Sequence, residues 1–272
     1  MRRGPVRGGF ALARVTGQAP TGAWGRLLGA ASTIGVLLAW ETVGRSGLVA
    51  PLFLPSLSSV LMEGWLMIGS GELWSHLGAS LWRILWGFLL GAGLGILLGL
   101  AMGISRLADG LGHPLVAASY PIPKIALLPL FILWLGLGEP SKVAVIGLGV
   151  FFPVVVNTRA GVRDVNPLLI QAAVSLGSTR ARIARKVLLP ASLPTIFAGL
   201  KLGAGAALLL LVTAEMIAAD KGIGFMILSA ANLMQTTRLL FGILLLAALG
   251  LLSNWMLAAL ERRLLPWKQQ AH

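Results

Sequence analysis

Six long apolar stretches constrain the fold of this chain more than any other feature. They lie near residues 27 to 44, 82 to 104, 115 to 135, 142 to 160, 193 to 217 and 239 to 260. Their lengths are close to the roughly 20 residues that a helix needs to cross the hydrocarbon layer of a bilayer. Inside that layer the backbone must satisfy its own hydrogen bonds, which a helix does within one segment. The sequence therefore predicts an all-α membrane protein with about six transmembrane helices.

The composition supports this prediction and excludes other classes of protein. Of 272 residues, 57% are hydrophobic and only 11% are charged, whereas soluble domains carry about 25% charged residues. A net charge of +13 would suggest nucleic-acid binding in a soluble protein, but here the basic residues flank apolar runs, so we expect no nucleic-acid partner. The absence of cysteine excludes disulfides, thiolate metal sites and a cysteine nucleophile.

The basic residues also predict an orientation. With a cytoplasmic N-terminus, fifteen of the 22 lysines and arginines fall in cytoplasmic segments, against four in external loops and three within spans. Because positive charge is retained in the cytoplasm, both termini are expected there. Residues 1–26 read as a basic cytoplasmic arm, and 266–272 as a cytoplasmic tail. The external loop from Arg45 to Leu81 contains Trp65 and Trp74, which suit helices anchored at the membrane interface.

The loop between the fourth and fifth spans has the pattern of two short helices joined by a turn. Asn166 and Pro167 start the first helix, and Gly177 can adopt the left-handed conformation that ends it. Ser178 or Thr179 can cap a second helix that runs to Leu189, before prolines lead into the fifth span. We expect a helix-turn-helix elbow at the cytoplasmic surface.

Two faces of this elbow are candidates for docking. Ala172 and Ala173 leave one side of the first helix flat, so that another backbone can approach closely. Arg182, Arg185 and Lys186 form a basic stripe along the second helix. The stripe alone fits an interfacial helix held by anionic lipid, at about 1 kcal/mol per basic residue, as well as it fits a protein partner.

The spacing QAAVSLG, followed after eleven residues by Leu189-Pro190, resembles the EAA loop of the membrane permeases of bacterial ATP-driven (ABC) importers. This resemblance implies that the elbow, at about residues 166–194, inserts into a groove of an ATP-binding subunit. It assigns coupling roles to Gln171, Ala172, Ala173, Gly177, Arg182, Leu189 and Pro190. Gln171 stands where glutamate is usual and Val187 where isoleucine is usual. Gln171 keeps the hydrogen-bonding reach but not the charge.

Residues 71–91, 121–142 and 214–227 are similar to the permeases for aliphatic sulfonates, taurine and nitrate. The resemblance covers about residues 27–265 and implies one transport domain with the MetI-like fold of type I importers. It implies a second permease copy, two ATP-binding subunits, an extracytoplasmic solute-binding protein and a bacterial inner-membrane location. The chain contains no G-x-x-x-x-G-K-[ST] phosphate loop. ATP and Mg²⁺ are therefore expected on the partner subunit, with no cofactor in this chain.

Polar residues inside the spans are the remaining candidates for function, because such residues are costly when they face lipid. Lys124, Asn157 and Glu215 are candidates for the pathway or a gate, although Lys124 also fits an interfacial start to the third span and Glu215 fits helix pairing. Arg83 and Lys124 offer positive potential to a passing anion, with few acids nearby. Lys201 fits a side chain that reaches back to the interface.

Two rival functions belong to other classes. A membrane enzyme needs a cluster of reactive groups, but His76, His113 and His272 are scattered, so neither catalytic residues nor a metal site are expected. A secondary carrier or channel gives no reason for the spacing of the elbow. Among solutes, an aliphatic sulfonate or taurine is favoured, with nitrate, bicarbonate and a vitamin precursor as alternatives.

Overall fold

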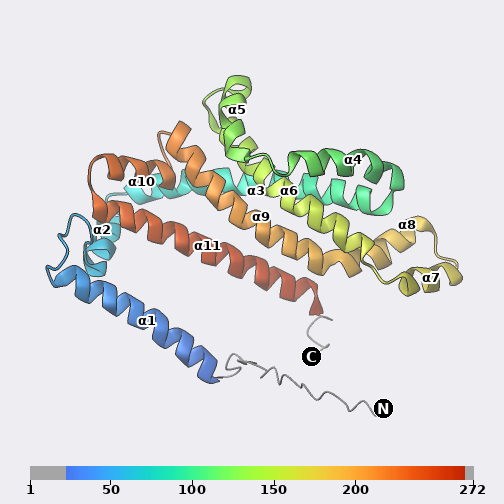
Figure 1. The fold of residues 1–272 in the computed structure, drawn as a ribbon, viewed down its shortest axis with the longest axis horizontal. Coiled ribbons are helices and arrows are strands. Elements are labelled where there is room, and N and C mark those ends of the chain that lie inside the picture. Colours follow the sequence, from blue (N-terminus) through green and yellow to red (C-terminus); the bar gives the residue numbers. More distant parts are fainter. Residues whose placement is uncertain (1–22, 267–272) are drawn as a thin grey trace, which may run out of the picture. The chain divides into compact units, whose positions relative to one another are not determined.

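The computed structural model describes residues 23–266, which fold into helices joined by short turns, with no strand in that range (Figure 1). The helices are α1 (Ala23–Arg45), α2 (Leu57–Gly69), α3 (Glu72–Ile104), α4 (Arg106–Ser119), the 3₁₀ turn η1 (Lys124–Leu127), α5 (Leu128–Leu135), α6 (Glu139–Arg163), α7 (Pro167–Ser175), α8 (Arg180–Ile183), the π turn η2 (Ala184–Leu188), α9 (Leu189–Ala218), α10 (Ile223–Asn232) and α11 (Thr236–Leu264). The predicted all-α class is confirmed. The basic arm lies largely outside the described residues, as does most of the predicted tail.

The chain divides into two compact units between Leu57 and Ser58. The first unit consists of α1 and the loop that follows it. The indole of Trp40 donates a hydrogen bond to the carbonyl oxygen of Pro55 at 3.0 Å. A methyl group on Gly44 would lie only 2.7 Å from Ser56 Cα, so the loop folds back closely onto the end of the helix.

Five helical segments are long and apolar enough to cross a membrane, and a bent pair formed by α4 and α5 makes six. α3 begins at Glu72, although its span was predicted from residue 82, so part of the predicted external loop is helical. At 1.5 Å per residue its 33 residues extend about 50 Å. That length exceeds the roughly 30 Å hydrocarbon layer, so α3 projects beyond it.

The span predicted near 115–135 is a bent pair of helices and not a single helix. α4 starts earlier, at Arg106, and the chain then bends by 93° between Ser119 and Lys124. The cause is the segment from Tyr120 to Pro123, because two prolines remove backbone donors and disfavour helical geometry in the residues before them.

A stripe of glycines brings α3 and α6 into backbone contact. Gly87, Gly91, Gly95, Gly99 and Gly103 recur at every fourth position, and a methyl group on any of them would lie within 3.0 Å of an atom of α6. At Gly91 the nearest atom is the carbonyl oxygen of Gly147, at 2.2 Å. Small residues at such spacing let membrane helices approach closely. On its other side α6 packs against α9, so α6 is the central helix of the second unit.

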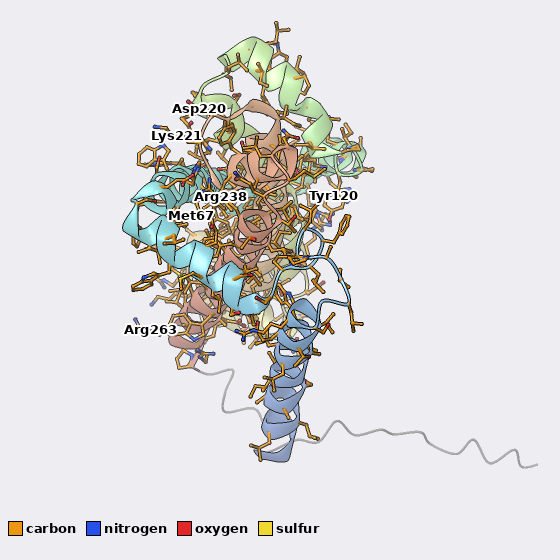
Figure 2. All side chains as sticks on the ribbon, turned by 90° about the vertical axis from the view of Figure 1, so that its left-hand side faces the viewer. Met67, Tyr120, Asp220, Lys221, Arg238 and Arg263 are labelled. Atoms are coloured by element: carbon orange, nitrogen blue, oxygen red, sulfur yellow. The ribbon has the colours of Figure 1, made fainter. Side chains whose placement is uncertain are left out.

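A separate apolar cluster joins α2, α3, α10 and α11. Its buried members are Met67, Leu73, Ile223 and Met226. Figure 2 shows Arg238 close to Met67, where α11 begins beside α2. Arg238 donates hydrogen bonds to Glu63 of α2 and to Glu72 of α3 at 3.0 to 3.1 Å. These ion pairs tie the middle of α2 to the starts of α3 and α11.

Candidate functional site

The segment between α6 and α9 folds as the predicted elbow. α7 begins after Asn166, whose side-chain oxygen accepts a hydrogen bond from the Leu168 N–H at 2.9 Å. Pro167 occupies the first position of the helix, where its missing N–H has no intrahelical partner to lose. The local sequence therefore sets the start of α7.

Gly177 ends α7 in the left-handed conformation, with φ of +71°. Its N–H donates to the Val174 carbonyl at 2.9 Å, and the Ser178 N–H donates to the Ala173 carbonyl at 3.0 Å. This pair of bonds is the Schellman motif, which satisfies the last carbonyls of a helix. The predicted role of Gly177 in the turn is confirmed.

Thr179 caps the second helix, and its hydroxyl accepts from the Arg182 N–H at 3.4 Å. The prediction that this helix ends before the prolines is wrong, because helical structure continues from Arg180 to Ala218. The π turn at Ala184–Leu188 precedes Pro190, and the Leu189 N–H donates to the Ala184 carbonyl. The wider bonding of the π turn accommodates the missing N–H of Pro190, so the second helix of the elbow and the fifth span are continuous.

The outer surface of the elbow carries exposed apolar side chains that the sequence reasoning missed. Leu176 is 83% exposed, Leu168 67% and Val174 58%. Gln171, Ala172, Gly177 and Arg182 are also exposed, whereas Ala173, Leu189 and Pro190 are half-buried. Several large apolar side chains exposed on one short segment mark a candidate binding surface, and their place in a loop between two spans was the sequence signal for it. We call Leu168, Val174 and Leu176 the elbow patch.

Arg182, Arg185 and Lys186 line a groove beside this patch, together with Ala181. All three basic side chains are exposed. The predicted basic stripe is therefore present on the second arm of the elbow, within reach of an acidic partner or lipid.

A buried ion cluster joins α3, α6, α9 and the turn before α10. The Arg83 guanidinium makes a two-point hydrogen bond with Glu139, at 2.7 and 2.6 Å, and a third hydrogen bond with Glu215 at 2.8 Å. It also donates to the Lys221 carbonyl at 2.6 Å. The prediction that Arg83 has few nearby acids is wrong, because two carboxylates flank it. The ion pair between Arg83 and Glu215 joins α3 to α9.

Glu215 is fully buried, and both of its oxygens are used. One accepts hydrogen bonds from Ser80 at 2.7 Å and from Arg83, and the other accepts from the Gly224 N–H at 2.8 Å. Gly222 adopts φ of +130°, and a methyl group there would lie 2.3 Å from the Glu215 carboxyl carbon. The carboxylate therefore fixes the turn that connects α9 to α10.

The other intramembrane candidates serve separate local contacts. Lys124 begins η1 and donates to the carbonyls of Ser119, Tyr120 and Ile122, and so holds the bend between α4 and α5. The amide of Asn157 donates to the Pro153 carbonyl one turn earlier in α6, at 2.8 Å. Within residues 23–266 no hydrogen bond joins any two of Lys124, Asn157 and Glu215.

Lys201 pairs with Glu261 of α11 at 2.5 Å. Residues 23–266 contain no group of three or more His, Cys, Asp or Glu side chains able to hold a metal ion.

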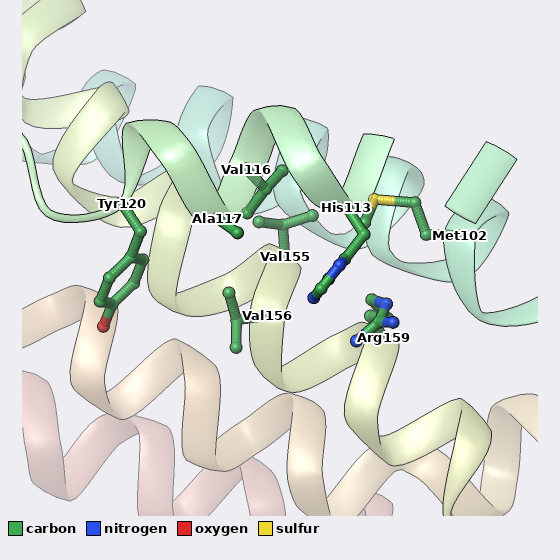
Figure 3. A pocket seen from close by; sticks show the side chains of 8 residues that line it. All are labelled: Met102, His113, Val116, Ala117, Tyr120, Val155, Val156 and Arg159. Carbon is green, nitrogen blue, oxygen red and sulfur yellow. The ribbon is translucent and has the colours of Figure 1, made fainter. Parts of the chain in front are cut away.

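A cavity of about 260 Å³ opens between α3, α4 and α6 (Figure 3). His113 and Arg159 project toward it, with Val116, Ala117 and Val156 along its wall. The Arg159 guanidinium forms an ion pair with Asp109 of α4. The sequence analysis did not single out this site, because its residues lie on three helices and have no local motif.

Known proteins resemble this chain over most of its length. It is 42% identical over 241 residues to the taurine transport system permease protein of Escherichia coli, covering 86% of this chain and 88% of that protein. It is 36% identical over 239 residues to the aliphatic sulfonates transport permease protein of the same organism, described as putative, covering 88% and 91%. Among solved structures, an inward-facing methionine ABC transporter, MetNI, contains a chain that matches 74% of this one with a TM-score of 0.57 and 19% identity. That likeness concerns the fold and agrees with the predicted MetI-like class.

Residues 91–266 match the family described as the binding-protein-dependent transport system inner membrane component. This range contains the elbow, the bend at Lys124 and all of α6, α9 and α11. With its apolar helices, the chain is thus a multi-pass inner-membrane protein. It belongs to the family of inner-membrane permease components of binding-protein-dependent ABC transport systems.

Proposed function

We propose that this permease imports taurine or another short aliphatic sulfonate, driven by ATP hydrolysis on a separate subunit. The observation that carries the solute assignment is the 42% identity to the taurine permease over 86% of this chain. The matched region includes the helices that carry the elbow and the buried ion cluster. The permease itself makes and breaks no covalent bond in this proposal.

The elbow is the proposed docking site for the ATP-binding subunit. Its apolar patch of Leu168, Val174 and Leu176 is exposed, and the basic groove lies next to it. A helical pair that presents apolar side chains beside fixed positive charge suits insertion into a groove with an acidic rim. Gln171, Ala172 and Ala173 lie on the same helix as the patch, and Leu189 and Pro190 begin α9. ATP and Mg²⁺ are held by that partner.

The proposed assembly contains two permease copies, two ATP-binding subunits and an extracytoplasmic solute-binding protein. The translocation path lies between the two copies. Both termini and the elbow face the cytoplasm, since the segments on that side hold most of the basic residues. Lys124, Asn157 and Glu215 are proposed to affect this path through the helix geometry that they maintain.

Growth and uptake test this proposal. A strain that lacks the gene should fail to grow on taurine or an alkanesulfonate as sole sulfur source, yet grow normally on sulfate, and the intact gene should restore growth. Uptake of radiolabelled taurine into whole cells should fall in parallel. Normal growth of the deletion strain on both sulfur sources would show that the solute is another one. Calorimetry with the adjacent binding protein then distinguishes nitrate, bicarbonate and a heterocyclic vitamin precursor.

A further inference from the structure

The cavity between α3, α4 and α6 combines unsatisfied donors with an apolar wall. Its volume of about 260 Å³ lies just below the range of roughly 300 to 1,000 Å³ that is usual for drug-sized ligands. Its mouth is open, since His113, Ala117 and Val156 are exposed, and the site suits a small molecule. The cavity has no role in the contacts that hold the elbow or the Arg83 cluster.

The charge at the cavity is positive. Arg159 and Arg163 both pair with Asp109, and Arg163 Nη2 lies 2.6 Å from Asp109 Oδ2. Two guanidinium groups therefore share a single carboxylate. Arg159 uses Nε and Nη2 in this pair, and within residues 23–266 its Nη1 makes no hydrogen bond. An anion can use that donor without breaking the ion pair.

His113 adds a second polar group from α4. Its ring projects into the cavity beside Arg159 (Figure 3) and makes no hydrogen bond to any residue that the structure describes. A ring nitrogen that carries a proton is a donor, and a guanidinium is a planar donor suited to oxyanions. Together they face one end of the cavity with N–H groups.

Most of the rest of the wall is apolar, and the ring of Tyr120 also lines the cavity. Val116 and Ala117 contribute from α4, and Val155 and Val156 from α6. A ligand that matches both the N–H donors and the apolar wall carries an oxyanion at one end and a short carbon chain at the other. An inorganic anion would leave the valine surface unused.

We propose that this cavity binds a short organosulfonate, with Arg159 and His113 at the sulfonate oxygens and Val116, Ala117 and Val156 around the carbon chain. The assignment of the ligand rests on the proposed function, because taurine is the solute proposed there. Arg159 lies near the end of α6, which finishes at Arg163 shortly before α7. The bound molecule is therefore held at the elbow end of the permease.

Binding of [³⁵S]taurine to the complete permease–ATPase complex, in nanodiscs and without the solute-binding protein, tests this proposal. Two substitutions fill the cavity, Ala117→Trp and Val156→Phe, and His113→Leu removes a donor. Leu115→Trp is the matched control, because Leu115 is 70% exposed on the same helix and does not line the cavity. ATP hydrolysis by each complex shows that it is assembled.

The intact complex should bind taurine, and each filling variant should weaken binding at least tenfold while Leu115→Trp does not. Methanesulfonate should compete, and sulfate should compete much less. An intact complex that transports taurine but does not bind it without the receptor would overturn the site and leave the proposed function standing. Equal competition by sulfate would overturn the ligand class. Transport of a different solute, with no taurine binding, would overturn both proposals.

Discussion

At the scale of single residues, the buried pair of Arg83 and Glu215 determines how three helices meet. Arg83 has a side-chain exposure of 2% and Glu215 of 0%. Removing one partner of a buried pair leaves an uncompensated charge and typically costs about 3 to 5 kcal/mol. In Glu215→Ala the buried guanidinium of Arg83 keeps only the half-exposed carboxylate of Glu139, and the Ser80 hydroxyl and the Gly224 N–H lose their acceptor. We therefore expect this variant to lower the free energy of unfolding by about 3 kcal/mol, and to lower the melting temperature of the purified, detergent-solubilised protein.

Glu139→Ala is the matched control for this prediction, because it removes the other carboxylate from the same arginine. The Glu139 side chain is 46% exposed, so solvent screens its charge and the expected loss is about 1 kcal/mol or less. If both variants lost the same free energy of unfolding, burial would not determine how much each carboxylate stabilises the protein.

The same cluster shows what the sequence could not reveal at this scale. Arg83 and Glu215 were each predicted to avoid lipid, since a charged side chain within a span is costly. Their pairing was missed because 132 positions separate them along the chain. Glu139 was not considered at all, although it begins α6 at the end of an apolar run. The position of a charged residue within an apolar span is enough to predict that it is buried. Its ion-pair partner cannot be predicted in this way, because the partner is set by how the helices pack.

At the scale of helices, the turn at Gly177 depends on backbone conformation alone. A methyl group there would meet nothing within 4 Å, but the residue requires φ of +71°. We expect Gly177→Val to strain the turn by about 1 to 2 kcal/mol and to weaken assembly with the ATP-binding subunit. Co-purification and ATP hydrolysis of the reconstituted complex measure this effect.

Gly177→Asn serves as the control, because asparagine adopts the left-handed conformation more readily than β-branched residues. This variant should retain most of the assembly. Wild-type ATP hydrolysis by the Gly177→Val complex would be evidence against a coupling role for the elbow.

The glycine stripe gives a second prediction for helices. Gly91→Ala places a methyl group 2.2 Å from the Gly147 carbonyl oxygen, so α3 and α6 must separate, at a cost of about 1 to 3 kcal/mol. Gly93→Ala meets nothing within 4 Å and should be neutral or slightly stabilising, because alanine favours helices. Thermal unfolding of both variants measures the difference, and similar melting temperatures would contradict close backbone packing as the role of the stripe.

Signals in neighbouring residues made the elbow predictable. The bend between α4 and α5 was missed, because apolar residues on both sides of it read as one span. The cap at Asn166, the left-handed glycine and the cap at Thr179 each depend on a few neighbouring residues, so the sequence alone indicated them. The prolines at 121 and 123 also indicated a break in the helix. The span was nevertheless drawn across them, because the residues on both sides are apolar. The continuation of α9 through Pro190 was missed because proline usually ends a helix, and a π turn was not anticipated.

At the scale of the whole molecule, the orientation in the membrane is open to direct test. Reporters fused after Gly69 and after Lys221 should share one side, because the Gly222 N–H donates to His76 at 3.1 Å and Arg238 joins α2 to the start of α3. We expect both to be external, and reporters after Arg106, Gly177 or Gln270 to be cytoplasmic. A reporter at Gly177 on the external side would contradict the proposed contact with an ATP-binding subunit.

The family and the class of fold followed from the sequence, because apolar length, charge placement and elbow spacing persist when individual contacts change. The arrangement of the cavity did not follow, since it depends on how α3, α4 and α6 pack, which brings His113 and Arg159 together from distant parts of the chain. The solute remains the part of the function that depends most on comparison with relatives.

Helical structure runs without a gap from Arg180 to Ala218 and so links the elbow to the Arg83 cluster. Within it, α9 has 30 residues and extends about 45 Å at 1.5 Å per residue, with Leu189 at one end and Glu215 near the other. The π turn at Ala184–Leu188 lies between Arg182 and α9. We expect a stiff π turn to carry a displacement of the elbow along α9 to the turn before α10, and a flexible one to let the elbow move without Glu215.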